Sequence, residues 1–265
     1  MVRRNVSLLA VPSFLYRLVL QVEEKTGYAV ALTEQDALGY DQITRFATPR
    51  QPYHEISYIP AYRDYAVHFF TTGLRKILRF WELPPEERLV PVTQAGQRLP
   101  DPEHAEVVQR IPAAAGIDVD HLSRFLYEGT VRQLISVPGD LRVEQEIAAQ
   151  IPEHRDDQRS YLLRQIKDLE EHFAPEIAAF APRRVYQAVS AMNIVLAEVA
   201  SDIAGVDFPT YTRASPHRPL AGQLRSRLDA VEEPGYRGDR KATDAWAEEL
   251  DMESWFDWLL VEDLD

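Results

Sequence analysis

The amino-acid sequence predicts an α+β protein: a small N-terminal unit with a short sheet, followed by a larger, mostly α-helical region. Patterns typical of strands occur only in the first third of the chain, and apolar residues at helical spacing dominate from about residue 100 onward. The 265 residues are 45% hydrophobic and 27% charged, which is typical of a globular protein with a buried core.

The first third is expected to fold as a helix, a small sheet and a second helix. Gly27 suits the position just past the end of the first helix. Pro52 and Pro60 flank the second strand, which favours a place near the sheet edge. Gly73 falls on the apolar face of the second helix, where the lack of a side chain permits close approach. Residues 40–47 are ambiguous. The expected elements are helices over 11–26 and 61–82 and strands over 28–33 and 53–59.

The rest of the chain is expected to be helical, with prolines between the helices. A stretch rich in Pro, Gly and Gln over 84–102 indicates a boundary, which divides the chain into an N-terminal unit over 1–95 and a helical unit over 96–265. Residues 206–219 and 232–241 are expected loops. The expected helices cover 101–111, 118–136, 140–150, 156–174, 176–204, 219–231 and 242–260.

Composition and charge exclude several kinds of chemistry. The absence of cysteine excludes disulfides, thiol catalysis and thiolate zinc sites. The net charge of −13 disfavours a sequence-independent nucleic-acid binder and suits a basic protein partner. No apolar run reaches the roughly 18 residues that a membrane span needs, and no targeting signal is visible. We therefore expect a cytoplasmic protein without membrane association.

The C-terminal segment 239–265 combines negative charge with aromatic residues. It holds ten Asp or Glu residues against two basic ones, together with Trp246, Trp255 and Trp258. One interpretation is an acidic helix that docks on a basic protein partner through these tryptophans. The other is a terminal helix over 242–260 that packs its aromatic side on the body and turns its acids to water. We expect packing, and both roles can share one helix.

No catalytic motif is visible. None of the seven histidines lies three to five residues from another, so the HExxH motif of helical zinc sites is absent. Neither a GxSxG nucleophile turn nor a glycine-rich phosphate loop occurs. We therefore expect no catalytic residues, no metal and no cofactor. His54, Glu55 and His68 are candidates for a polar site. The alternative is a metal-dependent hydrolase with ligands from distant elements, for instance His54 with His68 or His172.

One local cluster of basic residues lies on the expected helix over 61–82. Arg75, Lys76 and Arg79 fall within five positions of one another. The cluster fits a phosphate or nucleic-acid patch, which is the basis of a third hypothesis, a nucleic-acid-linked regulator. The same charges also complement the dipole at a helix C-terminus.

Residues 53–88 resemble a segment of ImmA/IrrE-like metallopeptidase domains, on the strength of HEISYIP, ILRF and PPEER. In that family a short strand leads into a helix that carries HExxH, often within a string such as HECGHILR. When Ile77–Arg79 is aligned with the end of that string, Thr72 takes the place of the first His, Gly73 that of the Glu and Lys76 that of the second His. The resemblance implies a zincin-like N-terminal unit whose three catalytic positions are replaced.

The function that this resemblance implies is that of a non-catalytic, peptidase-like scaffold acting through protein–protein contacts. Relatives in the family act in stress response, prophage control and toxin–antitoxin systems. A regulatory or defence role in a bacterium is therefore the first hypothesis for this chain.

Overall fold

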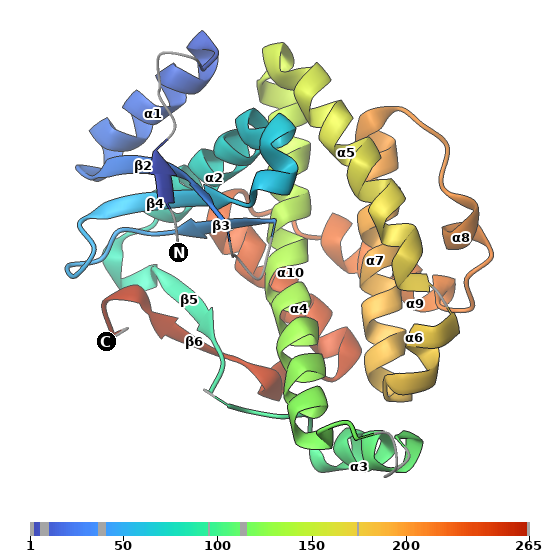
Figure 1. Ribbon diagram of the computed structural model, residues 1–265. Helices are drawn as coiled ribbons and strands as arrows, with labels where there is room; N and C mark the ends of the chain where they lie inside the picture. The colour runs from blue at the N-terminus through green and yellow to red at the C-terminus, as the bar shows by residue number, and fades with distance from the viewer. Residues whose placement is uncertain are drawn as a thin grey trace.

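The computed structural model describes residues 3–5, 11–36, 41–94, 96–111, 116–173 and 175–263. It confirms the α+β class, with a small sheet unit beside a larger set of helices (Figure 1). The strands are β1 (Arg3–Asn5), β2 (Ala29–Gln35), β3 (Gln42–Arg45), β4 (Tyr53–Tyr58), β5 (Leu89–Val92) and β6 (Asp257–Leu260). The helices are α1 (Ser13–Thr26), α2 (Ala66–Trp81), α3 (Asp101–Arg110), α4 (Val119–Gln150), α5 (Arg155–Leu169), α6 (Pro175–Phe180), α7 (Arg183–Ala204), α8 (Thr210–Arg213), α9 (Arg218–Asp229) and α10 (Gly235–Leu250).

The main sheet has four strands in the order β1-β2-β4-β3. β4 pairs with β2 in parallel and with β3 in antiparallel orientation. The expectation that residues 53–59 lie near the sheet edge is therefore wrong, because β4 has a neighbour on each side. The prolines do not prevent this, since the paired residues run from Tyr53 to Tyr58 and Pro52 and Pro60 lie just outside them.

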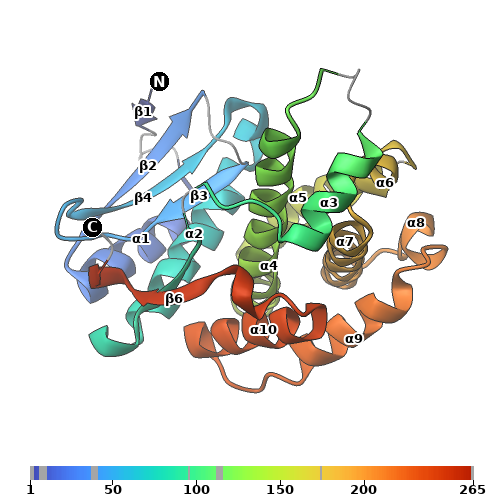
Figure 2. The same ribbon diagram turned by 90° about the horizontal axis from the view of Figure 1, so that it is seen from below.

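Helices α1 and α2 cover one face of this sheet (Figure 2). Gly73 of α2 lies against Ile56 of β4, and a Cβ atom at residue 73 would lie 2.8–2.9 Å from three side-chain carbons of Ile56. The close approach expected at Gly73 is therefore confirmed. The segment before α2, Pro60–Tyr65, is a 3₁₀ helix, so the regular α-helix begins later than the sequence pattern predicted.

Helix α4 contributes to the two larger hydrophobic cores of the described residues. Its N-terminal half packs with α7, α9 and α10, where Tyr127 and Leu134 are buried. Its C-terminal half packs on the sheet unit, where Val143 and Ile147 are buried. Figure 1 shows α4 standing between the sheet and the outer helices. The division into units over 1–95 and 96–265 stays a prediction.

The sequence predicted separate helices over 118–136 and 140–150, but α4 is continuous and contains Pro138. Pro138 is buried, so its ring contributes packing while it removes one helical hydrogen bond. Packing on both sides of this position outweighs the local preference for a break. At Pro182 the opposite holds: the predicted helix over 176–204 is divided there into α6 and α7.

The C-terminal region differs most from expectation. Helix α10 ends where Asp251 adopts a left-handed conformation with φ of 56°. The chain then forms β6, which pairs antiparallel with β5 and places Leu260 opposite Leu89. The predicted helix over 242–260 is therefore wrong beyond the end of α10, and most of the predicted loop over 232–241 is helical. We call the two-stranded sheet of β5 and β6 the ribbon.

None of the helices in the described ranges is both long enough and apolar enough to cross a bilayer.

Candidate functional site

Two of the three positions that align with the zinc motif face one small cavity. Thr72 and Lys76 of α2 line it together with Asp140 of α4, and its volume is about 50 Å³. The Lys76 ammonium nitrogen lies 2.7 Å from a carboxylate oxygen of Asp140. Gly73 faces the sheet instead. In the described ranges no group of three or more His, Asp or Glu residues is placed to hold a metal ion.

His54 and Glu55 lie on opposite faces of β4 and have separate structural partners. The buried His54 ring accepts a hydrogen bond at Nδ1 from the backbone N–H of Ala47 at 3.0 Å, and burial lowers its pKa to about 4. Glu55 accepts hydrogen bonds from Arg45 at 2.8 Å and from Gln35 at 3.1 Å. Neither side chain lines the cavity beside Lys76.

His68 belongs to a buried polar chain that connects α2, α4 and α5. Its Nδ1 lies 3.1 Å from Nε2 of His154. Its Nε2 lies 3.0 Å from a carboxylate oxygen of Glu144. Gln158 donates to the other carboxylate oxygen of Glu144 at 2.7 Å.

Burial and neighbouring charges decide the protonation of the side chains in this buried polar chain. Burial and the nearby charge of His68 lower the pKa of His154 to about 4. Burial alone would raise the pKa of Glu144, but the contacts with His68 and Gln158 outweigh it and lower the pKa. The adjoining cavity has room for water and not for a peptide. The side chains of this buried polar chain therefore hold α2, α4 and α5 together. His54 is not one of them.

The three basic residues of α2 are paired with carboxylates rather than gathered on a free surface. Arg75 and Arg79 both contact Glu146 of α4. Arg79 is 5% exposed and its Nε donates to Asp239 of α10 at 2.9 Å. Together with the pair formed by Lys76, these contacts join α2 to α4 and α10. A phosphate would have to compete with carboxylates that are already in place.

The C-terminal tryptophans mostly serve packing. Trp246 is fully buried and Trp255 is 2% exposed, so the packing expected for them is confirmed and neither is accessible to a docking partner. Trp246 Nε1 donates to the backbone carbonyl of Leu224 at 2.9 Å. Trp258 is half-buried on β6, and its Nε1 donates to Asp244 at 2.8 Å.

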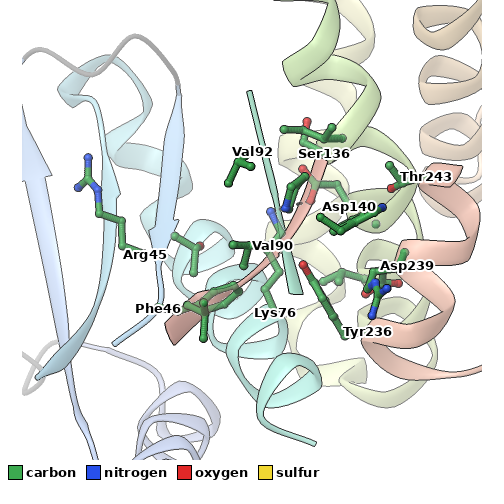
Figure 3. A pocket seen from close by; sticks show the side chains of 18 of the residues that line it. Arg45, Phe46, Lys76, Val90, Val92, Ser136, Asp140, Tyr236, Asp239 and Thr243 are labelled. Atoms are coloured by element: carbon green, nitrogen blue, oxygen red, sulfur yellow. Dashed lines mark ion pairs between the residues drawn. The ribbon is translucent and has the colours of Figure 1, made fainter. Parts of the chain in front are cut away.

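A second, much larger cavity lies where the sheet unit, α2, α4, α10 and the ribbon meet (Figure 3). Its volume is about 520 Å³, within the range of sites for small molecules. Much of its wall is apolar, with Phe46 beyond β3, Val90 and Val92 on β5, and Val143 on α4. Trp258 closes the side formed by β6. The pair of Lys76 and Asp140 lines both cavities and therefore separates them.

Helix α10 supplies four of the polar side chains that line the large cavity, and the others come from β3, the segment after β3, α2 and α4. Tyr236, Asp239, Arg240 and Thr243 share one face of that helix because they are three, four and seven positions apart. Within the described residues the hydroxyls of Tyr236, Thr243 and Ser136 make no hydrogen bond. Burial and the nearby Asp239 raise the pKa of Tyr236, so this hydroxyl stays protonated and can donate a hydrogen bond. An apolar cavity with several unused donors is typical of a ligand site.

Both carboxylates of the cavity wall are already neutralised. Asp239 accepts from Nε of Arg79 at 2.9 Å and from Nε of Arg142 at 3.1 Å. Burial raises the pKa of Asp239, and the two arginines oppose that shift. Asp140 is held by Lys76. The described residues that line the cavity include no histidine and no glutamate, so an unengaged general base is missing from its wall.

Sequence reasoning missed this cavity, although one signal for it was present. The spacing of Tyr236, Arg240 and Thr243 is helical, but it begins in a stretch that its Pro and Gly residues mark as a loop. The contribution of the ribbon could not be read from sequence, because β5 and β6 are four residues each and far apart in the chain.

Comparison of the chain with protein-family models, with curated proteins and with solved structures gave no significant match. The resemblance to ImmA/IrrE-like domains stays a prediction. Function is therefore inferred from the geometry of the two cavities and of the residues between them.

Proposed function

We propose that this chain is a non-catalytic, peptidase-like scaffold with a regulatory role, and that it works by binding a small molecule in the large cavity. The observation that carries the proposal is the pair of Lys76 and Asp140. It occupies the side of α2 on which the aligned motif would place metal ligands, and it forms a wall of the cavity. The ammonium group of Lys76 places a positive charge where a metal ion would lie, and it leaves no site at which a metal ion could be coordinated.

The absence of a free base in the cavity wall supports binding over turnover. General acid–base catalysis needs a group that exchanges a proton near the working pH. Asp140 and Asp239, the carboxylates among the described residues of the cavity wall, are each held by basic side chains and are not free to take a proton from a neighbouring hydroxyl. The serine, threonine and tyrosine hydroxyls of the wall can serve a bound molecule as hydrogen-bond donors and acceptors.

The test uses the neutral fluorescent probe N-phenyl-1-naphthylamine, which gains fluorescence in apolar sites. We expect saturable binding near one probe per chain. Ser136→Leu, which places a larger side chain in the cavity, should abolish binding. The matched control Ser160→Leu lies on the exposed face of α5 and should leave binding unchanged.

A parallel assay follows cleavage of a fluorogenic peptide library, with and without added zinc. We expect no cleavage in either case. Cleavage that a chelator stops, or probe binding that Ser136→Leu leaves intact, would contradict the proposed function.

A further inference from the structure

The unpaired charge of the large cavity is positive, and it belongs to Arg240. In the described part of the chain no carboxylate lies within 4.0 Å of its guanidinium group. Its nearest acceptor is the backbone carbonyl of Glu87, at 3.4 Å from Nη1. The carboxylate of Glu87 is taken by Arg237, which donates to it from Nε at 2.5 Å and from Nη2 at 2.7 Å.

Arg240 is held in place by packing. Its guanidinium carbon lies 5.1 Å from the centre of the Trp258 ring, so the cation stacks on the indole. Its Nε is buried and has no hydrogen-bond partner. The Trp258 ring therefore fixes the position of this guanidinium group in the cavity wall.

The neighbours of Arg240 on α10 supply further donors to the same place. Tyr236 lies four positions before it and Thr243 three positions after it, so all three face the cavity. Both hydroxyls are without partners within the described residues. A guanidinium group flanked by two hydroxyls is suited to a carboxylate, because it offers several donors to two acceptor oxygens.

A cationic ligand finds no matching group. The carboxylates of Asp140 and Asp239 are engaged by Lys76, Arg79 and Arg142. Phe46, Val90, Val92, Val143 and Trp258 offer apolar surface that matches a hydrocarbon or aromatic body, and the polar side chains of Thr44, Arg45, Thr48, Gln51 and Ser136 also line the described wall.

On these grounds we infer that the large cavity binds a small carboxylic acid with an apolar body, whose carboxylate is held by Arg240, Tyr236 and Thr243. This inference rests on the proposed function and names the class of its ligand. It assigns the specificity for a negative charge to α10 and the affinity for the body to the ribbon and α4.

The experiment compares three probes that differ only in their head group: 4-phenylbutyrate, 4-phenylbutanamide and 4-phenylbutylamine. Each is titrated against the full chain by calorimetry and by displacement of N-phenyl-1-naphthylamine. We expect the carboxylate to bind about tenfold or more tightly than the amide, and the amine to bind most weakly. Affinity for the carboxylate should fall with added salt.

Two variants locate the charge. Arg240→Gln should lower affinity for 4-phenylbutyrate about tenfold or more and leave the amide unaffected. Arg240→Lys keeps a positive charge and should retain part of the affinity, which guards against a loss of folding in the first variant. The control Arg17→Gln removes an exposed cation on α1, outside the cavity wall, and should change nothing.

The outcomes separate this inference from the proposed function. Equal or tighter binding of the amide or the amine, or an unchanged affinity in Arg240→Gln, overturns the assignment to a carboxylic acid while the cavity remains a binding site. If none of the three probes binds or displaces the neutral fluorophore, the assignment is also overturned. The proposed function has its own tests: it fails if the neutral fluorophore does not bind, if its binding survives Ser136→Leu, or if cleavage that a chelator stops is found.

Discussion

Replacing Gly73 with alanine tests the contact that brings α2 onto the sheet. An added Cβ at residue 73 lies 2.8 Å from Cδ1 and 2.9 Å from Cγ1 and Cγ2 of Ile56. Ile56 is fully buried on a strand with neighbours on both sides, so its side chain cannot swing away into solvent. Either the helix must move out or the isoleucine must leave its preferred rotamer.

Two opposing contributions decide how much Gly73→Ala changes the free energy of unfolding. Alanine favours a helix interior over glycine by about 1 kcal/mol. Overpacking of a dense core costs about 1–3 kcal/mol. We expect Gly73→Ala to lower the free energy of unfolding by up to about 2 kcal/mol. Gly73→Leu adds three more carbons to the same contact and should lower it further.

The assay is urea unfolding, with Gly129→Ala and Gly222→Ala as matched controls. Both control glycines lie in helices with nothing within 4 Å of the added Cβ, so both substitutions should stabilise the protein through helix propensity. A double substitution completes the test. Ile56→Ala removes all three carbons that collide, so in that background Gly73→Ala should become stabilising.

A Gly73→Ala protein that is as stable as the Gly129→Ala control would refute the reasoning. So would additive effects in the cycle with Ile56→Ala, because additivity means that the two side chains do not compete for one space.

Four further predictions concern metal, the C-terminus, charge and pH. The protein should purify without stoichiometric zinc, and a chelator should leave its melting temperature unchanged; one zinc per chain by elemental analysis contradicts this. Deletion of 242–265 should lower the melting temperature substantially or cause aggregation, because it exposes buried apolar surface. Replacing five acids of this segment, of which Glu249 is partly buried and the others are exposed, with their amides should change it little. An intact melting curve after deletion would show that the segment does not pack. The charge variant replaces Asp244, Glu248, Glu249, Asp251 and Glu253. Arg79→Met should lower the free energy of unfolding in urea by about 3–5 kcal/mol, because it leaves the buried carboxylate of Asp239 with one partner fewer. Arg225→Met, at a more exposed pair, should lower it by at most about 1 kcal/mol. Equal costs would argue against a buried network. The unfolded chain binds a proton at a histidine near pH 6.5 and folded His154 does so only near pH 4, so stability should fall as the pH is lowered between these values; His154→Gln should flatten that part of the curve, and an unchanged slope would exclude this histidine as a cause.

Local features of the fold could be predicted where one residue decides the structure. Gly27 ends α1 in a left-handed conformation with φ of 75°, which glycine adopts without strain. Gly73 marks the close contact with the sheet, and the helical spacing around Trp246 marks a buried face. In each case the physical requirement is local, so the type of residue at that position indicates the structure.

Features that depend on distant partners could not be predicted. Pro138 reads as a helix break, and only packing against two cores shows why α4 continues through it. Pro52 and Pro60 suggest an edge strand, and only the pairing shows that they lie outside the ladder. The candidate site depends on such partners throughout. Lys76 was identified as a replaced motif position, whereas its partner Asp140 lies on another helix and carries no signal of its own.

The pairing of β5 with β6 has a consequence for the order in which the molecule is made. Leu89 can find its partner Leu260 only after all of the intervening chain has been synthesised, and closing so long a loop is slow. Until then the cavity lacks the walls formed by Trp258 and Val261. Nascent chains that already contain a folded sheet unit and α4 therefore lack part of the wall of the large cavity, which is complete only when residues 257–260 pair with β5.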